Sequence, residues 1–173
     1  ALAELGRRGH EVPRLRVVGD GPERAHLSQV SAASGVNVQF VGELPHDVVV
    51  EELAAAEILV VPSRQEALGL APLEAMAAGC VPVASAAGGL VESVVDGVTG
   101  LTCVPDDPAA LASALERALA IVHDAERRAA MVGAGDAVAR GHDVDALTAR
   151  TVALYTDGVH GAKAAAGARA SGP

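Results

Sequence analysis

Two carboxylates, Glu66 and Glu74, lie in segment 60–83, where residues able to bind a polar ligand are densest. A carboxylate accepts hydrogen bonds through both oxygens, so each could bind two neighbouring hydroxyls of a sugar or ribose. Charge-assisted hydrogen bonds contribute roughly 1.5–3 kcal/mol each. The alternative interpretation is a solvated loop acid at Glu66 and a surface helix acid at Glu74. The pair predicts a hydroxyl site if the surrounding elements place both residues beside one loop.

The same segment indicates a phosphate site, because it reads as strand, loop, helix and strand. Ligands of open parallel sheets bind beyond the carboxyl ends of the strands, the position of residues 62–66 here. Gly69 would let the backbone approach a ligand closely. The amides of Gly69, Leu70 and Ala71 would be unpaired at a helix N-terminus, which accepts a phosphate. Pro72, which lacks an amide, fits the first turn.

Two further glycine loops follow predicted strands. Residues 19–22, Gly-Asp-Gly-Pro, lack the GxGxxG pattern of nicotinamide and flavin sites, and they predict either a ligand-lining turn or a tight strand-to-helix turn. Residues 86–89 precede another helix and predict a second set of free amides. If the sheet is parallel, all three loops converge on one edge.

The elements that must position these loops alternate along the chain. Short β-branched runs predict strands at 15–18, 36–41, 58–61, 81–84 and 101–104, and Ala/Leu segments predict helices at 23–34, 46–57, 70–78 and 89–95. Several strands are continuous apolar runs, which is typical of strands covered on both faces. The sequence therefore predicts an α/β fold, a doubly wound, Rossmann-like parallel sheet with helices on both faces.

From Asp107 onward the pattern is helical only. Apolar residues recur at helical spacing up to Val122, after a start that Asp106 or Asp107 could cap, and two less apolar helices follow at 126–140 and 143–155. We expect one domain over residues 1–157 and a disordered Ala/Gly-rich tail over 158–173.

Composition excludes several functions. Thirteen Lys and Arg against 22 Asp and Glu give a net charge of -9, and aromatics are 1% of residues, which argues against a nucleic-acid partner. No apolar run is long enough to span a membrane and no signal-peptide core is present, so we expect a protein that is not transmembrane and is cytoplasmic.

Residues that could bind a metal have simpler interpretations. Cys80 and Cys103 lack a CxxC spacing and predict reduced core thiols. The pairs at 46–47, 123–124 and 142–143, each His-Asp, fall at predicted helix boundaries, as does the Asp-Val-Asp triplet at 143–145, and predict helix caps. We expect no metal site and no cofactor.

The motifs, in this order, resemble the C-terminal, donor-binding half of retaining glycosyltransferases with the GT-B fold, family four of the sequence classification (glycosyl transferases group 1). The resemblance covers about residues 14–135 and rests on the following segments: LRVVGDGP at 15–22, VQFVG at 38–42, AEILVVPS at 56–63, the E-x7-E pair Glu66 and Glu74, EAMAAG at 74–79, PVAS at 82–85, GG-x-x-E at 88–92 and DGVTG at 96–100.

The resemblance implies a nucleotide-sugar site. Glu66 would bind hydroxyls of the transferred sugar as the catalytic-site carboxylate, Glu74 would bind the ribose, and the amides near Gly69 and Leu70 would bind the diphosphate. It also implies that Gly19 and Gly21 line the cleft and that Val41, Gly42 and Leu44 lie by the nucleobase, and it adds Ser63, Arg64 and Leu68 to the substrate-binding set. Transfer of a hexose-type sugar from a UDP- or GDP-sugar, with retained configuration and without a metal, is the expected reaction of a bacterial enzyme.

The sequence departs from the family at two points. Leu68 replaces the usual aromatic residue, and the Arg and Lys that hold the diphosphate are not matched, since Lys163 is the one lysine. We expect the first strand of this half and the N-terminal acceptor-binding domain to be missing, so the isolated chain should transfer no sugar. The alternatives are a stand-alone nucleotide-sugar-binding module and a receiver-like interaction domain phosphorylated at Asp20.

Overall fold

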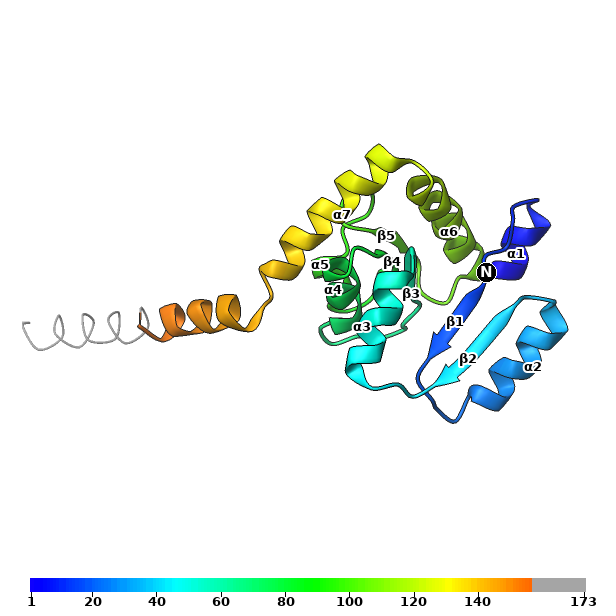
Figure 1. Ribbon diagram of the computed structural model, residues 1–173, viewed down its shortest axis with the longest axis horizontal. Helices are drawn as coiled ribbons and strands as arrows, with labels where there is room; N and C mark the ends of the chain where they lie inside the picture. The colour runs from blue at the N-terminus through cyan, green and yellow to red at the C-terminus, as the bar shows by residue number, and fades with distance from the viewer. Residues whose placement is uncertain (157–173) are drawn as a thin grey trace, which may run out of the picture.

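The computed structural model describes residues 1–156, with α/β elements in the predicted order (Figure 1). The strands are β1 Leu15–Val18, β2 Val38–Gly42, β3 Ile58–Val61, β4 Val81–Ser85 and β5 Leu101–Cys103. The helices are α1 Leu2–Arg7, α2 Arg24–Ser34, α3 His46–Ala55, α4 Leu70–Ala77, α5 Leu90–Ser93, α6 Pro108–Val122 and α7 Ala125–Arg140, followed by a helix over residues 144–156. The predicted tail at 158–173 lies outside the described residues.

Hydrogen bonding divides the strands into two parallel sheets. β1 pairs with β2, and β3, β4 and β5 pair in that order. The parallel direction and the helices on both faces confirm the predicted fold class, and within residues 1–156 the strands lie in two separately hydrogen-bonded sheets. No ladder joins β1 to β3 in this part of the chain.

The core is built around β4, whose five residues are all buried. Val81 and Val83 pack with α6, whereas Ala84 packs with α4 and α5. Since successive side chains of a strand point to opposite faces, this alternation places α6 on one face and α4 on the other. Burial on both faces explains why β4 has no alternation of apolar and polar residues.

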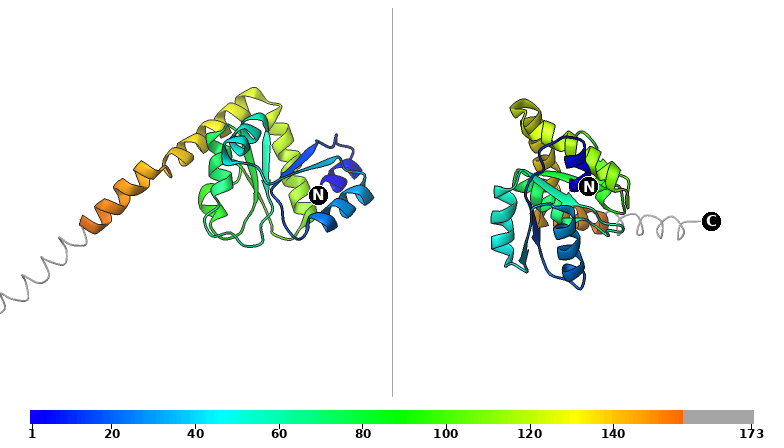
Figure 2. Two further views of the ribbon diagram at one scale, coloured as in Figure 1. Left: turned by 60° about the horizontal axis from the view of Figure 1, so that its bottom comes forward. Right: turned by 90° about the vertical axis from the view of Figure 1, so that its right-hand side faces the viewer.

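α7 packs across α4. The sequence alone predicted this helix but did not predict which element it packs against. Met131 is buried, and a Cβ atom at Gly135 would lie only 2.9 Å from Cγ of Met76. Gly135 therefore allows the two helices to approach closely. The helix over 144–156 then leads away from the body (Figure 2).

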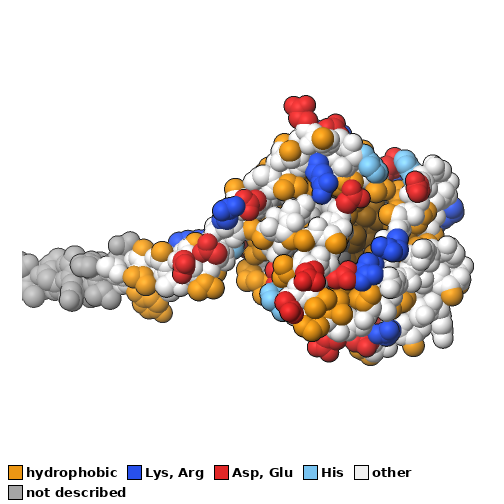
Figure 3. All heavy atoms as spheres, viewed as in Figure 1, with side chains coloured by type: hydrophobic (Ala, Val, Ile, Leu, Met, Phe, Trp, Pro, Cys, Tyr) orange, Lys and Arg blue, Asp and Glu red, His pale blue; other side chains and the backbone are white. Residues whose placement is uncertain are grey.

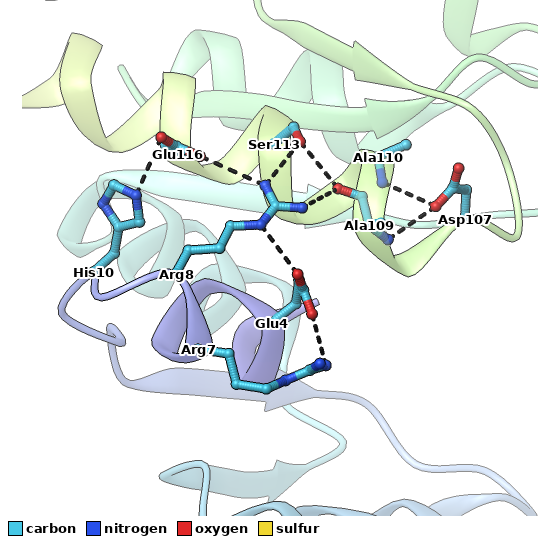
Figure 4. Close-up of polar contacts among 9 residues, drawn as sticks. All are labelled: Glu4, Arg7, Arg8, His10, Asp107, Ala109, Ala110, Ser113 and Glu116. Atoms are coloured by element: carbon cyan, nitrogen blue, oxygen red, sulfur yellow. Dashed lines mark hydrogen bonds and ion pairs between the residues drawn. The ribbon is translucent and has the colours of Figure 1, made fainter.

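α1 connects the small sheet to the larger one by packing on α6 (Figure 4). Leu5 is fully buried, and Nη1 of Arg8 donates to Oγ of Ser113 at 2.9 Å. Glu116 lies 3.1 Å from Nε2 of His10 and 3.6 Å from Nη1 of Arg8. Since α1 leads into β1, these contacts fix the start of the small sheet against the larger body.

The cysteines are free and buried, which confirms the prediction of core thiols. Burial raises the pKa of Cys80 to about 11 and also raises the pKa of Cys103. Both thiols are therefore protonated at neutral pH. Within residues 1–156, no cluster of three or more metal-ligating side chains occurs and no helix is long and apolar enough to cross a bilayer.

The predicted helix caps are confirmed at three of the expected aspartates. Asp107 accepts from the amides of residues 109 and 110, Asp124 from those of 126 and 127, and Asp143 from that of 146. The expected cap at His46–Asp47 is wrong, because α3 begins at His46 after Pro45 and no side chain caps it.

We predict that Asp96 makes stability depend on acid pH. Burial alone would raise its pKa, but hydrogen bonds from Arg117 and from the amide of Thr102 lower the pKa below its ordinary value of 3.8. A carboxylate with a depressed native pKa stabilises the fold above its ordinary pKa, and this contribution is lost as pH falls through the native pKa. Asp96→Asn should therefore unfold at lower urea concentration than the wild type at pH 7, and the difference should shrink as pH falls towards about 3.

Asp145→Asn, which removes one carboxylate at an exposed position, is the matched control and should unfold at the wild-type urea concentration at pH 7. If the urea concentrations of unfolding of Asp96→Asn and the wild type differed by the same amount at every pH, the prediction would be contradicted.

Candidate functional site

The loops at the carboxyl ends of β2 and β3 meet, although the two strands belong to different sheets. β2 leads into α3 at His46, and β3 leads through a loop into α4, which carries Glu74. Nδ1 of His46 lies 4.0 Å from Oε1 of Glu74. The two sheets therefore present their carboxyl ends on the same side, which is where ligands of such folds bind.

The loop that carries Glu66 rests directly on Gly88 and Gly89. The amide of Gly89 donates to the carbonyl of Glu66 at 3.0 Å. A Cβ atom at Gly88 would overlap the carbonyl oxygen of Glu66, and one at Gly89 would overlap that of Ala67. Only glycines at these two positions allow the loops after β3 and β4 to pack backbone to backbone.

The backbone hydrogen bonds correct the prediction of free amides at residues 86–89 for three of the four residues. The amide of Ala86 donates to Cys103, that of Ala87 to Ser85 and that of Gly89 to Glu66. These donors are used within the protein because the neighbouring loops supply carbonyls at bonding distance. Gly89 therefore supports the Glu66 loop through its own amide, and Gly88 supports it through the close approach of the two backbones.

The N-terminus of α4 has the predicted form. Gly69 adopts a left-handed φ of 75°, and no side chain caps the helix. A Cβ atom at Gly69 would lie 2.8 Å from the buried Leu90, so the position requires glycine for space as well as conformation. Leu68 and Leu70, 51% and 61% exposed, flank this uncapped end.

Glu66 and Glu74 are both half-buried beside this end of the helix. Oε1 of Glu66 accepts from the amide of Ala67 at 3.2 Å, which orients its carboxylate within the loop. Among the described residues, neither carboxylate is paired with an arginine. Their oxygens are thus available to accept hydroxyl groups, and Ser63, also half-buried, begins the same loop.

The small sheet brings its predicted residues together at a second turn. Gly19, with φ of 105°, donates through its amide to the carbonyl of Gly42 at 2.7 Å. Asp20 accepts from the amide of Gly21 at 3.0 Å, which closes a tight turn. Gly19 and Gly21 are exposed. Val41 and Gly42, at the end of β2, and Leu44, in the loop that follows, are half-buried.

Two arginines lie at this edge, one of which the sequence analysis missed. Arg24 pairs with Asp20 at 3.1 Å and donates to the carbonyl of Phe40 at 3.4 Å. A Cβ atom on Gly42 would lie 3.4 Å from Nη1 of Arg24, so the guanidinium covers the Gly42 loop. The i,i+4 spacing of Asp20 and Arg24 was the available signal.

Arg64 is held by a carboxylate as well. Its Nε lies 2.5 Å from Oδ1 of Asp106, and this hydrogen bond raises the pKa of Arg64 above its ordinary value. Asp106 has a left-handed φ of 57°, which is rare for a residue other than glycine. Both side chains are largely exposed, so solvent screens the pair and a ligand could compete for Arg64.

A cavity of about 450 Å³ lies away from these loops, at the turn between α6 and α7. Gly79, which lines it, precedes β4, so the cavity is at the amino end of the strands. Its other lining residues are Val122, His123, Ala125, Arg128, Ala129 and Val132. The cavity shares no residue with the predicted site.

We predict that Gly89→Ala displaces the Glu66 loop. The backbone at Gly89 has a φ of -68°, which alanine tolerates, so the effect must come from the overlap with the carbonyl of Ala67. We expect a loss of about 1–3 kcal/mol in the free energy of unfolding, with NMR shift changes centred on residues 63–69.

Gly133→Ala is the matched control, because an added Cβ in α7 meets nothing within 4 Å. It should stabilise the protein by about 0.5–1 kcal/mol, since alanine is the better helix former. Equal effects of the two substitutions would contradict the proposed loop contact.

The family model for glycosyl transferases group 1 matches residues 1–137. Among curated proteins, the chain is similar to the glycogen synthase of Mycobacterium tuberculosis, with 40% identity over 131 residues, covering 75% of this chain and 31% of the relative. The chain therefore spans about a third of the length of this relative.

Solved structures show the same fold. The chain is similar to sucrose-phosphate synthase from Thermosynechococcus elongatus, with a TM-score of 0.76, 29% identity, and coverage of 92% of this chain and 42% of that one. It is also similar to the Anabaena protein HepE in complex with UDP, with a TM-score of 0.73, 25% identity, and coverage of 91% and 44%. These likenesses support one half of a GT-B fold.

Proposed function

This chain belongs to the glycosyl transferases group 1 family, and we propose that its site binds the donor of a retaining sugar transfer. The donor is a UDP- or GDP-linked hexose. A single observation carries the proposal: the loop with Glu66, the uncapped N-terminus of α4 and Glu74 lie at the edge where the loop after β2 also meets Glu74. The structure of HepE with UDP supports a nucleotide as ligand.

Each part of the site fits one part of a nucleotide sugar. Glu66 accepts hydrogen bonds from the hydroxyls of the sugar, and Glu74 accepts from those of the ribose. The amides near Gly69 and Leu70 bind the diphosphate, aided by the positive end of the helix dipole. Val41, Gly42 and Leu44 line the nucleobase, with Gly19 and Gly21 at the entrance.

The chemistry we propose breaks the bond between the anomeric carbon and the diphosphate, and forms a bond from that carbon to the acceptor oxygen on the same face. The proton of the acceptor hydroxyl passes to an oxygen of the leaving diphosphate. Negative charge grows on the leaving diphosphate, and the amides at Gly69 and Leu70 stabilise it without reorganising. Arg64 joins them once the phosphate displaces Asp106. We propose that these groups hold the diphosphate without a metal, and that the acceptor is bound by an N-terminal domain in the cytoplasm.

The second candidate function is a stand-alone nucleotide-sugar-binding module. It is favoured by the pairing of both nearby arginines, Arg24 and Arg64, with carboxylates. An arginine that is already paired with a carboxylate can help to bind a nucleotide sugar. It stabilises the negative charge that develops on a leaving diphosphate less well. The receiver interpretation loses support, because Asp20 is bound to the amide of Gly21 and to Arg24.

We predict that UDP or GDP binds and that Glu74→Ala weakens binding about tenfold or more, because a charge-assisted pair of hydrogen bonds to the ribose is lost. NMR titration should show shift changes at residues 19–22, 41–44 and 63–74. Glu126→Gln, at the first turn of α7, is the control and should bind as the wild type does.

Whichever of UDP and GDP binds with the lower Kd identifies the donor class. Comparing that nucleotide with its sugar conjugate tests whether Glu66 binds the sugar. Absence of shift changes with either nucleotide at millimolar concentration, in a folded chain, would exclude the proposed site. Equal weakening by Glu74→Ala and Glu126→Gln would exclude the role of Glu74.

We predict that the 173-residue chain alone transfers no sugar, because the residues that hold an acceptor are not part of the site described above. The measurement is release of UDP or GDP from the bound sugar conjugate, with simple hexoses offered as acceptors. Release that depends on the acceptor and is abolished by Glu66→Gln would contradict this prediction.

A further inference from the structure

The cavity of about 450 Å³ at the turn between α6 and α7 has the size of a ligand site, although no part of the nucleotide site reaches it. Sites for small organic ligands commonly measure about 300–1,000 Å³ and are mostly apolar. Val122, Ala129 and Val132 give this cavity apolar lining. It is therefore suited to an apolar group of a small ligand.

Arg128 lines the cavity without a counterion. It is half-buried, and its side chain forms no ion pair or hydrogen bond within residues 1–156. Arg117, by contrast, lies 3.0 Å from Asp96, and Figure 3 shows basic side chains beside acidic ones at several places on one face. A guanidinium has five N–H donors, and its partial burial favours a partner that accepts them. The cavity therefore offers one uncompensated positive charge beside apolar surface.

The charge of Arg128 acts at the edge of the protein core. Burial raises the pKa of the Cys80 thiol to about 11, and Arg128 opposes that rise. Cys80 directly follows Gly79, which lines the cavity. Glu57 also acts on this thiol, but it forms no ion pair with Arg128 in the described part of the chain. The positive charge therefore lies close to the cavity lining and is not neutralised there.

Charge selects the head group of the ligand. A planar guanidinium matches the two oxygens of a carboxylate and can bind both. A phosphate monoester carries up to twice the negative charge at neutral pH, and Asp124 and Glu126 at the start of α7 would repel it more strongly. A single negative charge therefore fits this position best, and the apolar lining adds a hydrocarbon chain to it.

We propose that the cavity binds an aliphatic monocarboxylate. Its carboxylate pairs with Arg128, and its hydrocarbon chain lies against Val122, Ala129 and Val132. His123 also lines the cavity, and its side chain has no bonding partner within residues 1–156, so it is available to donate to the same carboxylate. This inference does not rest on nucleotide binding, because the two sites share no residue, and the failure of either proposal leaves the other standing.

The test is an NMR titration of the whole 173-residue chain with octanoate at millimolar concentration. Octanol, which lacks the charge, and acetate, which lacks the chain, are titrated in parallel. We expect saturable shift changes at residues 79–80, 122–123 and 125–132 with octanoate, and binding about tenfold or more weaker with each of the other two compounds.

Two pairs of variants separate the charge from the space. Arg128→Gln should weaken octanoate binding about tenfold or more, whereas Arg127→Gln, which removes the same charge at the neighbouring exposed position, should not. Ala129→Leu places a larger side chain in the cavity and should also weaken binding. Ala130→Leu, at an exposed position of α7 outside the lining, should bind as the wild type does. Both alanines are exposed and leucine is a good helix former, so these two chains should stay folded.

The proposal is overturned if octanoate causes no saturable shift changes. Equally tight binding of octanol or of acetate would overturn it as well, since the site would then read only the chain or only the charge. It is also overturned if Arg128→Gln binds octanoate as Arg127→Gln does, or if Ala129→Leu binds it as Ala130→Leu does.

Discussion

The candidate site depends on the backbone contact between the loop after β3 and the loop after β4. Gly88 and Gly89 leave no room for a side chain beneath the carbonyls of Glu66 and Ala67. This contact fixes the path of the chain into Gly69, and with it the direction of α4. Glu74 lies on the second turn of that helix, so the contact also sets the relation of the two carboxylates.

The site is divided between two sheets, and this division shapes its electrostatics. Each sheet contributes one arginine at the carboxyl edge, and each arginine is paired with a carboxylate of its own sheet, Arg24 with Asp20 and Arg64 with Asp106. The positive charge is therefore neutralised locally, which fits a chain with a net charge of -9. An anion at this edge would bind mainly through backbone amides unless it displaces a carboxylate.

The same apolar pattern had different outcomes in β3 and β4. Both strands were predicted because their runs of apolar residues suit positions covered on two faces. β4 has neighbours on both sides and is fully buried, whereas β3 has one neighbour and is half-exposed. The apolar pattern of a strand indicates the environment that suits it, whereas the pairing of the strand depends on which other strands are present.

The sequence by itself determined the elements, their order, the parallel direction of the strands and the position of Glu66, Gly69 and Glu74 around one loop, because periodicity, glycines and caps are local properties. Only the tertiary structure decided that Gly88 and Gly89 support the Glu66 loop, that Arg24 covers Gly42 and that Asp106 holds Arg64. It also decided that the strands form two sheets. These features join residues far apart in the chain, and their geometry follows from packing that no local pattern encodes.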